Sequence, residues 1–126
     1  MTILYADDDD EDQEFFAEII RAIDPKIKII RAKDGLQTVE LLSAGDTPDI
    51  ICLDFNMPVL NGHQTVLKIR KEKQFADTKV VILSTRLHGE AFAELASLNV
   101  LYASKPNTIQ EGIRTLKGII FDKTID

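Results

Sequence analysis

The sequence lacks the features that mark secreted, membrane-spanning and nucleic-acid-binding proteins. Cys52 is its one cysteine, which excludes an internal disulfide. No apolar run approaches the roughly 20 residues of a membrane span, and acids follow the first apolar residues at once, which argues against a signal peptide. The net charge of -6 disfavours nucleic acid as a partner, because phosphate binding depends on clustered lysine and arginine. We therefore expect a protein of the reducing cytoplasm, without a membrane or nucleic-acid partner.

The chain is also free of linkers, repeats and low-complexity tracts. Its 126 residues, of which 44% are hydrophobic, are enough to bury one core. We expect a single domain over residues 1–126.

Short β-branched runs alternate with segments in which apolar residues recur at helical spacing. The runs predict strands over residues 2–6, 27–31, 49–53, 79–83 and 100–103. The segments between and after them predict five helices, with apolar faces that include Ile19, Val39, Val66, Leu95 and Leu116. Because the third and fourth strands are nearly continuous apolar runs, helices should cover both faces of the sheet. The pattern predicts an α/β fold: a (βα)5 flavodoxin-like three-layer sandwich with a five-stranded parallel sheet in the order 2-1-3-4-5.

Residue pairs with the spacing of a capping box indicate where helices begin. They are Asp10 with Gln13, Asp34 with Gln37, and Asn107 with Gln110, and the pair Asn61–Gly62 can open the third helix. The acidic run ADDDDED over residues 6–12 fits a helix start too, because negative charge is favourable at the positive end of the helix dipole. Four of its six acids are explained in this way, and Asp7 and Asp8 are left over.

Polar residues follow the predicted strands at the edge where open parallel sheets bind ligands. Asp7 and Asp8 follow the first strand, Asp54 the third, Ser84 the fourth and Lys105 the fifth. Three acids this close would raise one another's pKa and cost stability unless a cation offsets them. Oxygen ligands without His or Cys favour Mg²⁺, and the lysine adds a fixed positive charge.

This set of groups predicts phosphoryl transfer to a carboxylate. A carboxylate can attack as a nucleophile and form an acyl phosphate, while a metal, a lysine and a hydroxyl stabilise charge on the phosphoryl oxygens. Asp54 is the best candidate nucleophile, because it is central and ends the most apolar strand. Asp7 and Asp8 are better suited as metal ligands.

Four stretches at these strand ends resemble the receiver domain of two-component response regulators, whose simplest member is the stand-alone, CheY-like regulator. They are ILYADD at residues 3–8, ICLDFNMPVLNG at 51–62, VILS at 81–84 and YASKP at 102–106. Each stretch alone is a weak signal, but the four occur in the expected order and the resemblance covers essentially the whole chain. It implies one receiver domain over residues 1–126 with no output domain.

The resemblance also implies how the metal and the phosphoryl group would be held. Asp54 would be the phosphoacceptor and a metal ligand. Asp8 would bind Mg²⁺ directly and Asp7 through water, and Asn56 would offer its backbone carbonyl to the metal.

Three further residues receive roles from the resemblance. Ser84 would be the switch hydroxyl that moves to meet the phosphate. Lys105 would pair with the phosphoryl group, and its bond to Pro106 is expected to be cis. Tyr102 would be an aromatic switch that turns inward when Ser84 moves.

A signalling switch, and not a dedicated enzyme, is the implied function. A histidine kinase or a histidine phosphotransfer protein would phosphorylate Asp54, with at most self-catalysed phosphorylation and dephosphorylation. A downstream target protein would bind the surface of the fourth helix, around residues 92–96, the strand at 100–103 and the last helix. The protein would be a monomer or a weak, phosphorylation-dependent dimer.

Three positions depart from the common pattern of this family. Thr85 stands where a small Ala is usual, and Asn99 stands where the turn before the last strand often has Gly. Arg86 lies two residues past Ser84, at a place that, as the resemblance implies, influences the lifetime of the phosphate. We predict that Arg86 and Asn56 tune hydrolysis by controlling the access of water to Asp54.

Three functions are alternatives to the signalling switch. A phosphohydrolase of the haloacid-dehalogenase type needs a second acid two residues after the nucleophile, where this chain has Asn56. A flavin carrier of the same fold needs a Ser/Thr/Gly-rich phosphate loop after the first strand, and acids stand there instead. A receiver that is never phosphorylated would serve as a constitutive interaction module.

Overall fold

The computed structural model describes residues 1–85 and 98–121. Within these ranges the chain alternates strands and helices, as the sequence predicts. The elements are β1 (Thr2–Ala6), α1 (Asp10–Ile23), β2 (Lys28–Ala32), α2 (Gly35–Ser43), β3 (Ile50–Asp54), α3 (Gly62–Lys71), the short 3-10 helix η1 (Lys73–Phe75), β4 (Lys79–Ser84), β5 (Leu101–Ser104) and α5 (Ile109–Phe121). The helix predicted around residues 92–96 lies outside the described residues.

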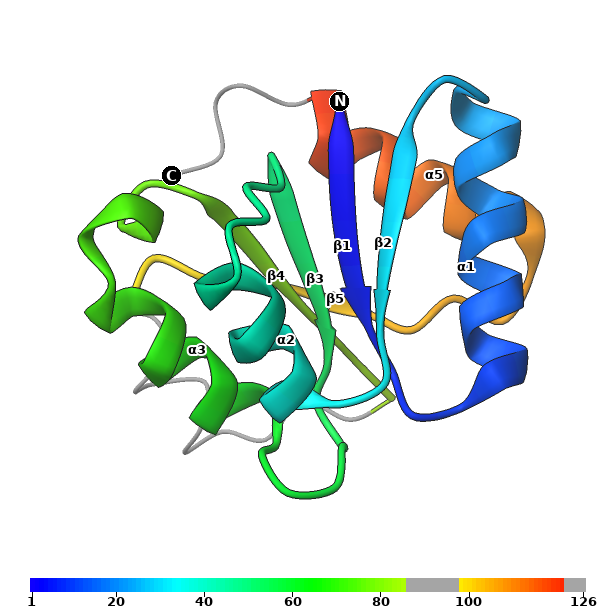
Figure 1. Cartoon of the computed structure of the whole chain (residues 1–126). Coiled ribbons are helices and arrows are strands. Elements are labelled where there is room, and N and C mark those ends of the chain that lie inside the picture. Colours follow the sequence, from blue (N-terminus) through cyan, green and yellow to red (C-terminus); the bar gives the residue numbers. More distant parts are fainter. Residues whose placement is uncertain (86–97, 122–126) are drawn as a thin grey trace.

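The five strands form one parallel sheet in the order β2-β1-β3-β4-β5, which confirms the predicted topology. Helices α1 and α5 pack on one face of this sheet, and α2 and α3 pack on the other, so that the fold has three layers (Figure 1). Strand bounds differ from the prediction by one residue at most. In the part of the chain that is described, no helix combines the length and the apolar character needed to cross a membrane.

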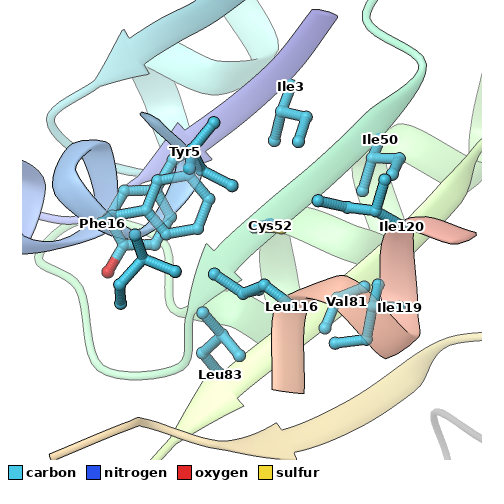
Figure 2. Packing of buried hydrophobic residues seen from close by; sticks show 12 residues of the cluster. Ile3, Tyr5, Phe16, Ile50, Cys52, Val81, Leu83, Leu116, Ile119 and Ile120 are labelled. Atoms are coloured by element: carbon cyan, nitrogen blue, oxygen red, sulfur yellow. The ribbon is translucent and has the colours of Figure 1, made fainter. Parts of the chain in front are cut away.

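Alternate residues of each central strand feed two separate cores. On the side of α1 and α5, Ile3 and Tyr5 of β1 pack with Phe16 and Leu116 (Figure 2). On the side of α2 and α3, the neighbouring β1 residues pack with Leu42 and Val66, among others. Strand β3 is buried throughout and β4 nearly so, as expected for strands covered on both faces.

Cys52 lies in the core beneath α1 and α5, as its apolar neighbours in the sequence predict. It is a free thiol, and burial raises its pKa to about 12. A thiol of this kind stays protonated at neutral pH and is unreactive.

A close approach between α1 and α5 depends on Gly112. An added Cβ at this position would lie 2.2 Å from Cδ1 and 2.8 Å from Cγ1 of Ile19, well inside van der Waals contact. The absence of a side chain therefore lets α5 approach the isoleucine of α1. This packing joins the two helices that cover one face of the sheet.

The helix starts confirm some of the predicted caps and correct others. Asn61 and Gln64 form a complete capping box at α3, and the Asp34 carboxylate accepts a hydrogen bond from the backbone N–H of Gln37 at α2. The other pairs are wrong by one residue. Asp9, and not Asp10, caps α1, and the Thr108 hydroxyl, in place of Asn107, accepts from the backbone N–H of Glu111.

The side chain of Gln13 bonds to backbone carbonyls and does not complete a capping box. Its buried side-chain amide donates hydrogen bonds to the backbone carbonyls of Asp7 and Ala32, at 3.1 and 2.9 Å. These bonds fasten the loop that follows β1 to the end of β2. They therefore hold in place the loop that carries the acids.

Arg70 connects α3 with the turn that leads into β5. Its guanidinium donates to the carbonyls of Leu98 and Asn99, both at 3.0 Å, and to those of Phe75 and Thr78 at 2.6 and 2.8 Å. Asn99 adopts a left-handed backbone conformation with φ 55°, which asparagine tolerates better than most residues. The turn can therefore form with asparagine at the position where glycine is expected.

None of the peptide bonds in the described residues is cis, so the bond between Lys105 and Pro106 is trans. The predicted cis bond is therefore wrong for this structure. Proline lowers the preference for the trans form without abolishing it, so that a trans bond remains the intrinsically favoured geometry.

Candidate functional site

The carboxyl ends of four neighbouring strands bring the predicted site residues to one edge of the sheet. Asp7 follows β1, Asp54 is the last residue of β3, and Ser84 is the last residue of β4. Lys105 follows β5, where its backbone N–H donates to the carbonyl of Ser84 at 3.0 Å. The backbone N–H of Asp7 donates to the carbonyl of Ala32 at 3.1 Å. Sheet pairing therefore continues for one residue beyond the strands and fixes where these side chains start.

Three acids converge at this edge. Asp7, Asp8 and Asp54 each offer a carboxylate oxygen, and these oxygens all lie within 4.8 Å of one another. Asp7 and Asp54 are buried, at 1% and 6% exposure, whereas Asp8 is exposed. The predicted convergence is confirmed, and the donor set fits a hard divalent cation, because it holds only oxygens and keeps one side open to water.

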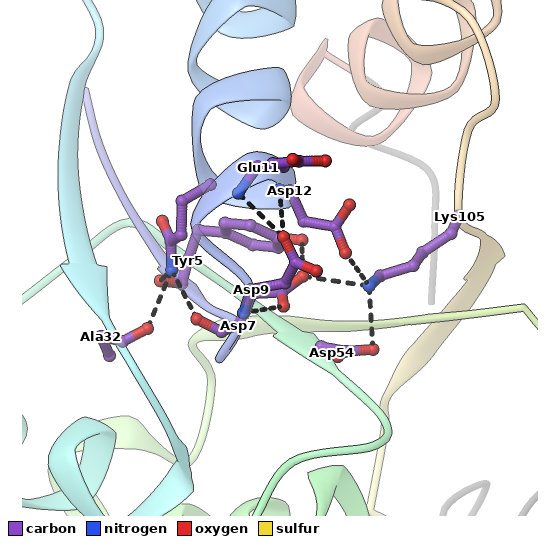
Figure 3. Close-up of polar contacts among 9 residues, drawn as sticks. Tyr5, Asp7, Asp9, Glu11, Asp12, Ala32, Asp54 and Lys105 are labelled. Carbon is purple, nitrogen blue, oxygen red and sulfur yellow. Dashed lines mark hydrogen bonds and ion pairs between the residues drawn. The ribbon is translucent and has the colours of Figure 1, made fainter.

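Lys105 provides the positive charge of the site. Its Nζ lies 3.0 Å from Oδ2 of Asp7, 3.3 Å from Oδ1 of Asp54 and 2.8 Å from Oδ2 of Asp12 (Figure 3). The sequence predicts Lys105 at the same edge as Asp7 and Asp54, and the first two contacts agree with that placement. The third is new, because the sequence assigns Asp12 only to the first turn of α1. No sequence signal identifies this contact, since its two residues are 93 positions apart and meet only because α1 packs against α5, the helix that follows Lys105.

Tyr5 is a second residue that the sequence does not identify as part of the site. Its hydroxyl donates a short hydrogen bond to Oδ2 of Asp7, and its ring stacks on Phe16 with 4.0 Å between the ring centroids. Asp7 also accepts from the backbone N–H of Asp9 at 3.0 Å. Burial, reinforced by the bond to Asp7, raises the pKa of Tyr5, so that the phenol remains a donor at all ordinary pH values.

Burial also governs the charge of Asp54. Loss of water raises the pKa of its carboxyl to about 6, and Asp7 adds to this effect. Lys105 and the backbone N–H of Asn56 act in the opposite direction and offset part of it. Asp54 is therefore ionised at neutral pH, but at a cost in free energy that a bound cation would relieve.

Lys105 keeps its charge for the complementary reason. Burial disfavours the ammonium, but hydrogen bonds to Asp12 and Asp7, together with the charges of Asp54 and Asp7, outweigh it. The pKa of Lys105 is raised as a result. The site thus holds a permanent cation among its acids.

The remaining predicted residues have definite places, while their roles stay predictions. Ser84 is buried at 3% exposure, and Asn56 is exposed in the loop after β3. Tyr102 of β5 is half-buried and packs against the core on the side of α2 and α3. Thr85 is exposed directly after β4. Arg86 lies outside the described residues.

Comparison with known proteins agrees with this geometry. Residues 3–117 match the family model described as the response regulator receiver domain. A chemotaxis protein CheY homolog from Campylobacter jejuni is 30% identical over 57 residues, which are 45% of this chain and 44% of that protein. The matched part thus spans less than half of that relative.

Solved structures are similar over nearly the full length. A two-component response regulator from Legionella pneumophila has a TM-score of 0.82 and 28% identity, covering 95% of this chain and 98% of that one. The chemotaxis response regulator CheY4 of Vibrio cholerae has a TM-score of 0.79 and 23% identity, covering 94% and 97%. With the five-stranded order, the acidic cluster and the lysine in place, the chain belongs to the response regulator receiver domain family.

Proposed function

We propose that the chain is a phosphorylation switch in which Asp54 accepts a phosphoryl group from a phosphohistidine of a histidine kinase or a histidine phosphotransfer protein. One observation carries this proposal. The carboxylate oxygens of Asp7, Asp8 and Asp54 lie within 4.8 Å of one another, and the ammonium of Lys105 contacts two of these residues. Receiver domains act as phosphoacceptor switches and bind Mg²⁺ in an acidic pocket of this kind.

The proposed reaction is an in-line displacement at phosphorus. A carboxylate oxygen of Asp54 attacks, a P–O bond forms, and the P–N bond to the donor histidine breaks, with its electron pair leaving on the imidazole. The product is an acyl phosphate on Asp54. Asp7, Asp8, Asp54 and the backbone carbonyl of Asn56 would hold Mg²⁺, which neutralises charge on the phosphoryl oxygens when it is bound.

Residues of this chain stabilise the transferred group from the other sides. Lys105 donates to the phosphoryl oxygens, and the Ser84 hydroxyl donates to another of them. Tyr102 responds to the movement of Ser84, which alters the surface of β5 and α5 that a downstream target protein binds. With at most self-catalysed phosphorylation and dephosphorylation, the protein acts through this surface as a monomer or a weak phosphorylation-dependent dimer in the cytoplasm.

Asn56 and Arg86 set the lifetime of the acyl phosphate in this proposal, by limiting the access of water to Asp54. Asn56 is exposed next to the buried Asp54, which supports its part in the proposal. We expect Asn56→Ala and Arg86→Ala each to change the rate of phosphate loss by more than about twofold. Decay of the phosphorylated protein, followed by intact-protein mass spectrometry, measures it, and two unchanged rates would show the idea to be wrong.

Uptake of phosphoryl groups from acetyl phosphate tests the function itself. With Mg²⁺ present, the wild-type protein should gain one base-labile phosphoryl group, and Asp54→Asn should gain none. Glu18→Gln, at an exposed position of α1, removes an equal charge and should behave as the wild type. No uptake would contradict the proposal and favour a constitutive interaction module. Rapid release of phosphate over many turnovers would favour a phosphohydrolase.

A further inference from the structure

The contact between Asp12 and Lys105 has no part in the proposed transfer reaction. It joins the first turn of α1 to the residue after β5 at 2.8 Å, the shortest of the three ion pairs that Lys105 makes with described residues (Figure 3). The carboxylate of Asp12 therefore competes for the lysine that the phosphoryl group needs. The inference drawn from this contact rests on the proposed function.

The ammonium of Lys105 already serves three carboxylates before any phosphoryl group arrives. An ammonium has three N–H bonds and no acceptor. Three carboxylates, those of Asp7, Asp12 and Asp54, lie within 3.3 Å of its nitrogen. A phosphoryl group on Asp54 brings additional negatively charged oxygens, so the carboxylates already present compete with them for the ammonium.

Asp12 is the partner that can leave at the lowest cost. The side chain of Asp7 has no exposed surface, and it is held by the hydroxyl of Tyr5 and the backbone N–H of Asp9. Asp54 is tied to the reaction because it carries the phosphoryl group. The side chain of Asp12 is 42% exposed, so that water can replace the ammonium as its partner.

We propose that Asp12 is a positioning residue that holds Lys105 in the unphosphorylated state and slows phosphoryl uptake until the lysine is released. Removal of the Asp12 charge leaves Lys105 free to meet the phosphoryl group. The transition state of uptake then becomes easier to reach. Hydrolysis changes little, because Lys105 contacts the phosphoryl group both before and during that step.

The test compares uptake and hydrolysis in the full chain. Acetyl phosphate donates its phosphoryl group to Asp54 as the P–O bond to acetate breaks and acetate leaves with the electron pair. At pH 7, in excess Mg²⁺ and 0.15 M salt, which screens general charge effects, Asp12→Asn should take up phosphoryl groups about three- to fivefold faster than the wild type. The rate of hydrolysis should change by less than about twofold.

Two further variants separate the proposed contact from a general effect of charge or folding. Asp10→Asn removes the same charge from the same exposed turn of α1, and should raise the uptake rate by less than about twofold, because Asp10 makes no contact with Lys105 among the ion pairs of the described residues. Asp12→Glu keeps a carboxylate within reach of Lys105 and should restore slow uptake.

The outcomes identify which proposal fails. Slower or unchanged uptake in Asp12→Asn, or equal acceleration in Asp10→Asn, would overturn the role of Asp12 while phosphoryl uptake by the wild type still supports the switch. Equal acceleration of uptake and hydrolysis would indicate a merely loosened site and would also overturn it. If the wild type takes up no phosphoryl group, the proposed function and this inference fail together.

Discussion

Replacement of Asp54 by asparagine should stabilise the metal-free protein at neutral pH. The residue Asp54 is 6% exposed, and burial raises the pKa of its carboxyl from 3.8 to about 6. The charged form is therefore disfavoured in the folded protein relative to the unfolded chain, in spite of the contact with Lys105. Asparagine has nearly the same shape without the charge, and Lys105 keeps its contacts with Asp7 and Asp12.

The size of this effect follows from the change in pKa. A pKa of about 6 in the folded state, against 3.8 in the unfolded chain, costs about 3 kcal/mol of folding free energy at pH 7. Because the folded pKa is the higher one, the penalty is absent below pH 3.8, grows as pH rises, and is complete above about pH 6. The free energy of unfolding of Asp54→Asn should thus exceed that of the wild type by up to about 3 kcal/mol at pH 7, and by about half of that at pH 5.

Urea denaturation in the presence of EDTA measures both values. Glu18→Gln is the control, because it removes one charge at an exposed position of α1 and should change the free energy of unfolding by less than about 0.5 kcal/mol. Two results would contradict a free-energy cost of burying the ionised Asp54. One is that Asp54→Asn is no more stable than the wild type at pH 7, and the other is that its gain in stability is the same at pH 5 as at pH 7.

Two other predictions concern packing and the support of the site. Gly112→Ala places a Cβ against Ile19 and should lower the free energy of unfolding by about 1–3 kcal/mol. Gly118→Ala lies in the same helix, but nothing is within 4 Å of its new Cβ, and it should raise the free energy of unfolding by about 0.5–1 kcal/mol. Urea denaturation of both variants measures the two changes, and equal changes would refute the role of the close contact. Tyr5→Phe removes the hydroxyl that donates to Asp7 and should lower the free energy of unfolding, measured in the same way, by about 1.5–3 kcal/mol. An unchanged free energy of unfolding would show that this bond does not hold Asp7 in place.

Much of the fold could be read from the sequence, because strand burial and the place of polar residues are local properties. The apolar runs that become β3 and β4 allow only strands covered on both faces, and this requirement leads to the parallel sheet. The convergence of Asp7, Asp8 and Asp54 follows from the same step, since each comes at or just after the carboxyl end of a strand.

Features that depend on packing between distant elements could not be predicted. Asp12 meets Lys105 only because α1 packs against α5, the helix that follows Lys105, and Tyr5 reaches Asp7 while its ring is stacked on Phe16. The sequence places the N-cap of α1 one residue too late, at Asp10, because several residues in a run of acids can cap a helix. In the structure Asp9 is the cap, and its Oδ1 accepts from the backbone N–H groups of Glu11 and Asp12.

The cation site admits the most direct test of the central claim, that Asp7, Asp8 and Asp54 act together. The chain has no tryptophan and two tyrosines, Tyr5 and Tyr102, so tyrosine fluorescence can report a Mg²⁺ titration through Tyr5, whose hydroxyl donates to Asp7. The wild type should show a saturable change. The exposed-site variant Asp8→Asn should bind at least about tenfold more weakly, while Asp10→Asn, with the same loss of charge, should stay close to the wild type. Absence of saturable binding, or equal affinities in wild type and Asp8→Asn, would contradict it.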